Sequence, residues 1–279
     1  MMKIAVELSS VADGSVENTI KYCQNLSVDR LTVPFATVDG FKETGRLDLA
    51  TVQDIKKQIE DACMSFNVMV DWTPEELVLG EGNADELFDN LCHNLEVMHE
   101  VGADILATFI MVTPGDTPAE TEERWDKLIG FYEKLMPVAE EAQVRVAEHT
   151  VANRARNIIW DYAAMKRLID SVPSPCNGVN YCTGNFWNSD GEDMYDQIRE
   201  LGEKVFYVHV RDTMRHLGEK PFWFDEGGID FARLILALRD INYQGDIRSE
   251  HMPEVYGENR TDIGTAWAAG YIKALMQFI

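Results

Sequence analysis

Basic residues are scarce in this sequence. Its 279 residues include 25 Lys and Arg against 48 Asp and Glu, which gives a formal net charge of −23. A charge of this size repels the phosphate backbone of nucleic acids and anionic lipid surfaces, so we expect no nucleic acid and no membrane partner. An acidic small-molecule substrate would need a local cation or a metal ion to reverse the repulsion.

Cysteines and long apolar runs are scarce as well. The five cysteines form no C-x-x-C pair and are too few for a disulfide framework, which suits a reducing compartment. No apolar run is long enough to span a membrane, and the opening Met1-Met2-Lys3-Ile4 lacks the basic-then-apolar order of an export signal. We therefore expect a cytoplasmic protein.

The sequence has no low-complexity tract, short repeat or internal linker, and two patterns alternate along it. Short β-prone runs occupy residues 3–8, 30–33, 67–71, 104–110, 144–148, 178–182, 205–210 and 246–250. Helical segments occupy residues 16–24, 49–65, 84–101, 118–142, 157–170, 190–201, 231–240 and 264–278. Eight strand–helix pairs predict an α/β fold, a single (β/α)8 TIM barrel that forms one catalytic domain over residues 1–279. A doubly wound open sheet is the alternative, but no glycine-rich fingerprint follows the first strand to favour it.

Four successive strands end in residues that can bind a metal ion. The ends are Glu148-His149, Cys182, His209 and Glu250-His251. The strands of such a barrel end at one mouth, where barrel enzymes carry their active sites. We therefore expect these side chains to converge on one point.

Alternation along each strand predicts which side chains face the barrel interior, because successive side chains point to opposite faces. We expect the more apolar face to pack under the helices and the more polar face to point inward. The outer face then carries Ile4, Val6, Leu8, Val68, Val70, Val144, Val146, Glu148, Phe206, Val208 and Val210. The inner face carries Glu7, Met69, Asp71, Arg145, His149, Cys182, Tyr207, His209, Arg211, Arg248 and Glu250. The phase selects His149 over Glu148 as the inward ligand, although a bulge at the barrel mouth would exchange them.

The candidate ligands form a mixed donor set of two imidazoles, one thiolate and one carboxylate. They are His149, Cys182, His209 and Glu250. Such a set suits a divalent transition metal, and the sulfur favours Zn²⁺, Fe²⁺ or Co²⁺ on coordination chemistry alone. Each residue also has a structural interpretation: Cys182 and His209 could be core residues, and Glu250 could pair with Arg248. Their matched phase on adjacent strands favours the metal site.

Several runs resemble the mannonate dehydratase family, whose pattern is NG-x-x-x-CTGS, H-x-R and D-H. The matching runs here are Asn177-Gly178-Val179-Asn180-Tyr181-Cys182-Thr183-Gly184-Asn185, His209-Val210-Arg211 and Glu250-His251. Residues 145–149 are similar to the family strand that ends in a histidine ligand, and residues 270–273 to its last helix. The resemblance covers mainly residues 140–279. It implies a sugar-acid lyase that eliminates water from an aldonic acid such as D-mannonate, gives a 2-keto-3-deoxy acid and uses Mn²⁺.

The sequence departs from that family in two places. Thr150-Val151-Ala152-Asn153 stands where the family has an acidic, proline-rich run. Asn259-Arg260-Thr261 stands where the family has a tyrosine thought to act in catalysis, and Tyr256 is a nearby candidate substitute. We expect Arg211 and the metal to hold the substrate carboxylate. His251 is a candidate general acid or base, or a residue that orients Glu250.

Other functions fit the same barrel. A metal-dependent sugar isomerase or epimerase would use the same proton abstraction without loss of water, and the missing tyrosine favours it. A non-catalytic sugar-binding barrel is a further alternative, whereas the negative charge disfavours an endonuclease. All the enzymatic interpretations share a small sugar or sugar acid as partner. The sequence is also compatible with a homo-oligomer.

Overall fold

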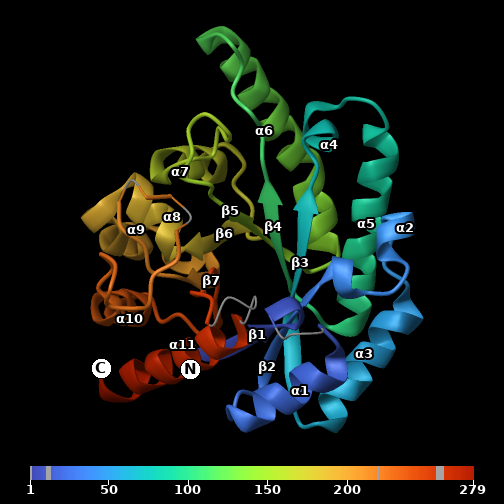
Figure 1. The fold of residues 1–279 in the computed structure, drawn as a ribbon. Helices are drawn as coiled ribbons and strands as arrows, with labels where there is room; N and C mark the ends of the chain where they lie inside the picture. Colours follow the sequence, from blue (N-terminus) through green and yellow to red (C-terminus); the bar gives the residue numbers. More distant parts are fainter. Residues whose placement is uncertain (1, 11–13, 216, 219, 256–260) are drawn as a thin grey trace.

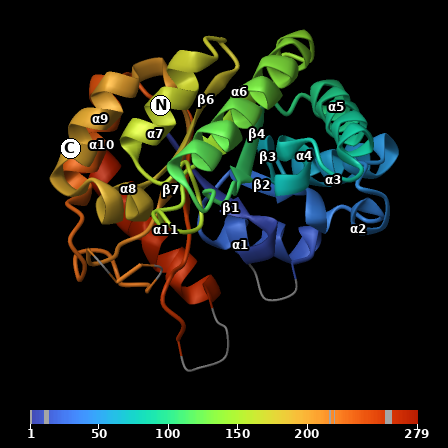
Figure 2. The same cartoon turned by 90° about the horizontal axis from the view of Figure 1, so that it is seen from above.

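The structure is a computed structural model that describes residues 2–10, 14–215, 217–218, 220–255 and 261–279. Its eight parallel strands, from β1 (Lys3–Glu7) to β8 (Asp246–Ser249), pair in sequence order, and β8 pairs with β1 to close a barrel. Helices surround the strands (Figure 1, Figure 2). The predicted (β/α)8 TIM barrel is therefore confirmed, and the open-sheet alternative is wrong.

The strands and helices alternate as the sequence patterns predict. The remaining strands are β2 (Arg30–Pro34), β3 (Ser65–Thr73), β4 (Ile105–Ile110), β5 (Arg145–His149), β6 (Asn177–Cys182) and β7 (Val205–Val210). The helices are α1 (Val16–Asn25), α2 (Phe41–Thr44), α3 (Leu49–Asp61), α4 (Glu75–Leu79), α5 (Ala84–Val101), α6 (Pro118–Glu141), α7 (Tyr162–Ser171), α8 (Thr183–Ser189), α9 (Met194–Leu201), α10 (Phe231–Asp240) and α11 (Thr261–Phe278). Short 3-10 turns are η1 (Leu8–Ser10), η2 (Phe35–Thr37), η3 (Gly191–Asp193) and η4 (Gly202–Lys204). In the described ranges, each helix is too short or too polar to cross a bilayer.

Two helices differ from their predicted bounds. The helix predicted over residues 157–170 begins only at Tyr162, because the Asp161 side chain accepts a hydrogen bond from the Ala164 N–H and caps the helix there. The helix predicted over residues 190–201 begins only at Met194, as α9, and a further helix that was not predicted, α8, precedes it and begins directly after Cys182. The early start of α8 places its first turn at the mouth of the barrel.

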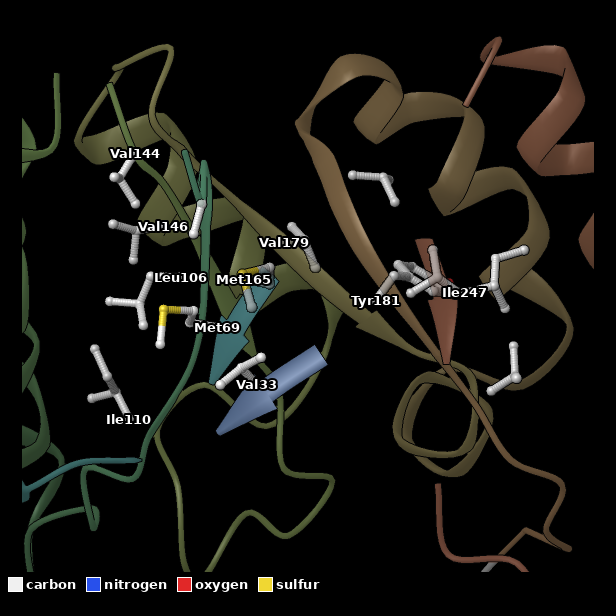
Figure 3. Packing of buried hydrophobic residues seen from close by; sticks show 14 of the residues in the cluster. Val33, Met69, Leu106, Ile110, Val144, Val146, Met165, Val179, Tyr181 and Ile247 are labelled. Atoms are coloured by element: carbon white, nitrogen blue, oxygen red, sulfur yellow. The ribbon is translucent and has the colours of Figure 1, made fainter. Parts of the chain in front are cut away.

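The main apolar core lies between the strands and the surrounding helices. Figure 3 shows part of it, in which Met69 of β3, Leu106 of β4 and Val146 of β5 belong to one cluster. The pairing register sets these three residues side by side on neighbouring strands. Each is at most 1% exposed, and burial of such a side chain stabilises the fold by about 1.5–3 kcal/mol.

A second, smaller apolar cluster fills the barrel interior. It consists of Val68, Val70, Ile105, Ala107, Ala147, Phe206 and Tyr207, with Phe109 packed against it. The predicted phase of β3 is therefore wrong: Val68 and Val70 point inward, Met69 joins the outer core, and Asp71 alternates with the inward residues. Strands of a parallel barrel are buried on both faces, so the contrast between apolar faces did not decide the direction of β3.

The predicted phase of β7 fails at one residue. Phe206 was expected on the outer face but belongs to the interior cluster. The β6–β7 register shifts between Val179 and Asn180, which pair with Val205 and Tyr207, so that Phe206 has no partner on β6. This bulge turns the Phe206 ring inward, where Gly178 leaves room for it, since a Cβ at Gly178 would collide with that ring.

Ion pairs close the end of the barrel opposite the candidate site. Arg30 Nε lies 3.2 Å from Asp246 Oδ1, and Lys3 Nζ lies 3.0 Å from Asp29 Oδ2. Glu7 does not pair with either of these cations. It lies 3.0 Å from Arg248 at the functional end, as the inward phase of β1 predicts.

The burial of Asp71 predicts a pH-dependent stability. Burial raises the pKa of Asp71 to about 7, whereas the carboxyl of an unfolded chain has a pKa of about 3.9. The folded state therefore retains a proton that the unfolded state releases, so this group lowers stability progressively as pH rises from about 4 to about 7. The Asp71→Asn variant has no carboxyl group at this position, so its stability lacks this pH dependence. Urea unfolding should show the variant gaining stability relative to the wild type between about pH 5 and about pH 8; a constant difference would contradict the prediction.

Candidate metal centre at the barrel mouth

Four neighbouring strands carry the predicted ligands to the C-terminal mouth of the barrel. His149 is the last residue of β5, and Cys182 is the last residue of β6. His209 is the next-to-last residue of β7, and Glu250 directly follows β8. Cys182 is the register partner of His209. The Glu250 N–H donates to the Val210 carbonyl at 3.0 Å, which holds Glu250 beside β7. Barrel closure thus brings these distant segments together.

Three of the predicted ligands form one buried group. Ligand atoms of His149, His209 and Glu250 all lie within 4.8 Å of one another. His209 Nδ1 lies 3.0 Å from Glu250 Oε2, and His149 Nε2 lies 3.9 Å from Glu250 Oε1. Neither ring nitrogen of His149 has a hydrogen-bond partner in the described part of the chain, although both are buried. A buried imidazole whose nitrogens have no hydrogen-bond partner is available to bind a ligand.

Cys182 contacts this group without being part of it. Its Sγ donates to Glu250 Oε1 at 2.7 Å, and the residue is 0% exposed. Burial raises the pKa of the Cys182 thiol, and the Glu250 charge raises it further, which agrees with the thiol acting as a hydrogen-bond donor to Glu250. The role of Cys182 as a fourth ligand stays a prediction.

Glu250 lies between two arginines. Arg211 Nε is 3.3 Å from Glu250 Oε1, and Arg248 Nη1 is 3.8 Å from Glu250 Oε2. Arg248 also reaches Glu7 of β1, with Nη2 at 3.0 Å from Glu7 Oε1. Burial opposes ionisation of Glu250, but its contact with His209 outweighs burial and keeps the pKa of Glu250 well below its ordinary value. The centre of the group is therefore a buried carboxylate.

His209 is neutral in this setting. Burial lowers the pKa of His209 to about 4, and this effect outweighs the attraction of Glu250, which acts in the opposite direction. Asn180 Nδ2 lies 3.4 Å from His209 Nε2, and Arg248 Nη1 lies 3.5 Å from the same nitrogen. A neutral imidazole has a lone pair to offer a metal, so the electrostatics suit a ligand.

The Glu148 side chain points away from the group, toward α6, and this direction fixes that of the next residue, His149. Its carboxylate accepts hydrogen bonds from the Tyr132 hydroxyl of α6 at 2.8 Å and from the Ile110 N–H at 3.0 Å. Glu148 therefore points outward, and the next residue, His149, points inward as the alternation of β5 predicts. No bulge exchanges the two side chains.

The first turn of α8 supports Arg211. Thr183 Oγ1 donates to the Arg211 carbonyl at 2.7 Å, and Arg211 Nη2 donates to Asn185 Oδ1 at 2.9 Å. A Cβ at Gly184 would collide with the Arg211 side chain, so this position needs glycine. Arg211 is 1% exposed and is not among the residues that line the cavity above the group. The expected contact of Arg211 with a substrate carboxylate is therefore not what this geometry shows.

A cavity of about 760 Å³ opens above the group. His149, Arg248 and Glu250 line its floor, and His251 lies on its wall. His251 is exposed and has a positive φ of 45°, a conformation that turns the chain sharply after Glu250. The cavity accommodates a small molecule.

One wall of the cavity is aromatic. Trp72 is 61% exposed and stacks on Phe109, with ring centroids 4.6 Å apart. Phe109 in turn lies 4.3 Å from the His149 ring and covers it. The sequence patterns did not reveal these two residues, nor the bond from Asn185 to Arg211, because nothing in a single strand shows which rings meet across the mouth. Tyr256, the remaining predicted catalytic residue, lies outside the described residues.

The chain belongs to the xylose isomerase-like TIM barrel family, whose model matches residues 20–268. Several curated relatives are named mannonate dehydratase. The Enterococcus faecalis protein is 32% identical over 148 residues, 49% of this chain and 41% of its own length. The Oceanobacillus iheyensis protein is 26% identical over 246 residues, 78% of this chain and 69% of its own length. The chain thus spans about half the length of the first curated relatives it matches.

Solved structures share the fold. Mannonate dehydratase from Streptococcus suis serotype 2 superposes with a TM-score of 0.77 and 18% identity, over 99% of this chain and 94% of that one. An L-ribulose 3-epimerase superposes with a TM-score of 0.75 and 18% identity, over 99% of this chain and 95% of that one. At these identities the structural likeness shows the fold alone.

Arg248 should be required for stability. Arg248→Met leaves Glu7 and Glu250 buried without this cation, so we expect a loss of about 3–5 kcal/mol in the free energy of unfolding. The double variant Arg248→Met, Glu7→Gln also removes the Glu7 carboxylate, one of the two buried negative charges left without Arg248. It should recover part of the lost free energy of unfolding. Urea denaturation of the three proteins measures both effects. A double variant less stable than the single one would show that Glu7 does not depend on Arg248.

Proposed function

We propose that this protein is a metal-dependent sugar-acid dehydratase that eliminates water from an aldonic acid such as D-mannonate to give a 2-keto-3-deoxy acid. The observation that carries the proposal is the buried His149–His209–Glu250 group at the floor of the cavity. Curated relatives named mannonate dehydratase support the same reaction. A divalent metal and a small sugar acid are accordingly the proposed cofactor and substrate.

The three residues fit a divalent metal. Two imidazoles and one carboxylate are a common ligand set for such ions, and a site with three protein ligands leaves room for substrate. The unpartnered nitrogens of His149 and the low pKa of His209 agree with ligands that are neutral and available. His149, His209 and Glu250 would hold the ion.

The donor set also bears on which metal binds. With the Cys182 thiol bonded to Glu250, the donors of the His149–His209–Glu250 group are nitrogen and oxygen. Such a set suits Mn²⁺ better than a thiolate set does, whereas Zn²⁺, Fe²⁺ or Co²⁺ would gain from the sulfur. We therefore propose Mn²⁺ as the metal.

Residues of this chain have distinct parts in the proposed reaction. When bound, the metal would supply positive charge that holds and polarises the oxygens of a sugar acid. Arg211 and Arg248 fix the carboxylate of Glu250, and Phe109 shields His149 from water. Arg211 is thus assigned to positioning Glu250 rather than to direct contact with substrate.

His251 is the proposed general acid or base. It lies on the cavity wall beside Glu250, and its imidazole can take the proton from the carbon next to the substrate carboxylate or return one to the leaving hydroxyl. An imidazole can both accept and donate a proton, which suits both transfers. The proposed part of Tyr256 falls on a residue outside those that the structure describes.

The ligand assignment predicts the metal content of variants. Purified wild type should retain about one divalent ion per chain, whereas His149→Ala and His209→Ala should lose it, because each removes one of three ligands. Cys182→Ala should keep it if the thiol serves Glu250 alone. His99→Ala, an exposed histidine on α5, is the matched control. Elemental analysis after dialysis measures the content; ion retention in both ligand variants would refute the site.

The reaction is tested with metal-loaded protein and a panel of aldonic acids. We expect a 2-keto-3-deoxy product from at least one acid, and a loss of about 100-fold or more in His251→Ala if that residue moves the proton. Absence of the product with every acid would reject the dehydratase. Incorporation of solvent hydrogen into a ketose without a keto acid would instead assign the epimerase, the alternative that the missing family tyrosine favours.

A further inference from the structure

The cavity carries two sets of cations that differ in their partners. The charged side chains that line it are Glu7, Lys42, Asp71, Arg156, Arg248 and Glu250. At the floor, Arg248 is matched by Glu7 and Glu250. At the rim, Lys42 of α2 and Arg156 of the segment after β5 are exposed. No carboxylate in the described ranges lies within 4.0 Å of either rim cation, and neither makes an ion pair.

Some surface cations of this protein lie in ion pairs, and others do not. The chain has 25 basic residues and 48 acidic ones. Lys21 lies 2.6 Å from Glu17, and Arg167 lies 2.7 Å from Glu122, as typical pairs. Lys42 and Arg156 remain without a carboxylate although both border a cavity that also contains acidic groups.

The acidic groups of the cavity do not neutralise the rim. Glu7 and Glu250 are held by Arg248 at the floor. Asp71 alternates with the inward-facing Val70 and is largely buried, and burial raises the pKa of Asp71 to about 7. Among the described residues, Lys42 and Arg156 therefore stand at the opening of the cavity without a paired carboxylate, in a molecule whose net charge is −23.

We propose that Lys42 and Arg156 form a rim subsite for an anionic group at the end of the substrate remote from the His149–His209–Glu250 group. The inference rests on the proposed function and extends its substrate class from simple aldonic acids to open-chain sugar acids with a second, terminal anionic group, a phosphate or a carboxylate. The overall field of the protein repels such a dianion, so its capture depends on local cations. Trp72 and Phe109, which form the aromatic wall, carry no charge. The positive charge that binds the terminal anionic group would therefore come from Lys42 and Arg156.

Isothermal titration calorimetry with three ligands tests the subsite. Gluconate has one carboxylate, glucarate has a second carboxylate at the far end, and 6-phosphogluconate has a phosphate there. Lys42→Ala and Arg156→Ala should each weaken binding of glucarate or 6-phosphogluconate by about fivefold and of gluconate by less than about twofold. Loss for both dianions indicates general anion binding, and loss for one of them identifies the terminal group.

Two exposed residues outside the cavity lining give matched controls. Arg46→Ala, close to α2, and Arg154→Ala, in the same segment as Arg156, make the same change in net charge and should leave all three affinities unchanged. Equal weakening by rim and control variants would assign the effect to the general field and overturn the subsite. Gluconate binding as tightly as both dianions would overturn it too.

The binding measurement separates this inference from the proposed reaction. Rim-dependent binding of a dianion without any dehydration product would reject the dehydratase and keep the rim subsite. Dehydration of aldonic acids together with affinities that do not respond to Lys42→Ala or Arg156→Ala would keep the dehydratase and reject the subsite.

Discussion

The barrel mouth is organised around one buried negative charge, the carboxylate of Glu250. Placing a carboxylate in a protein interior costs several kcal/mol unless its surroundings compensate. Here the compensation comes from His209 and Arg211, both near the end of β7, from Cys182 at the end of β6, and from Arg248 two residues before Glu250. Since Arg248 also holds Glu7, the same charge links β8 to β1. At this end of the barrel, ion pairs thus add to the backbone pairing that joins β8 to β1.

This arrangement divides the mouth into two halves. The β5 to β8 side carries the ionisable group, whereas the β3 and β4 side presents Trp72 and Phe109. Phe109 lies against His149 where the halves meet and limits water on that side. A polar floor with an aromatic wall suits a polyhydroxylated acid, whose oxygens and C–H faces differ in the same way. A dehydratase and an epimerase share this fold, so the fold alone does not decide the reaction.

The strand alternation predicted the site better than it predicted the interior. In β5 the outward position of Glu148 and the inward position of His149 followed from the flanking valines, and Tyr132 confirms the outward one. In β3 the same reasoning exchanged the inner and outer faces of the strand, because Val68, Met69 and Val70 are all apolar and both faces are buried. In β7 the bulge at Phe206 depends on the register with β6, which no pattern within β7 reveals.

The sequence by itself determined the eight strand–helix pairs and the set of ligand-type residues at successive strand ends, because hydrophobic period and residue type are local properties. Only the tertiary structure decided that Arg248 pairs with Glu7, that Cys182 bonds to Glu250, and that Lys42 and Arg156 border one cavity. These contacts join segments far apart in the chain. They depend on the stagger between strands when the barrel closes, and that stagger is set by the packing of the whole sheet rather than by any one strand.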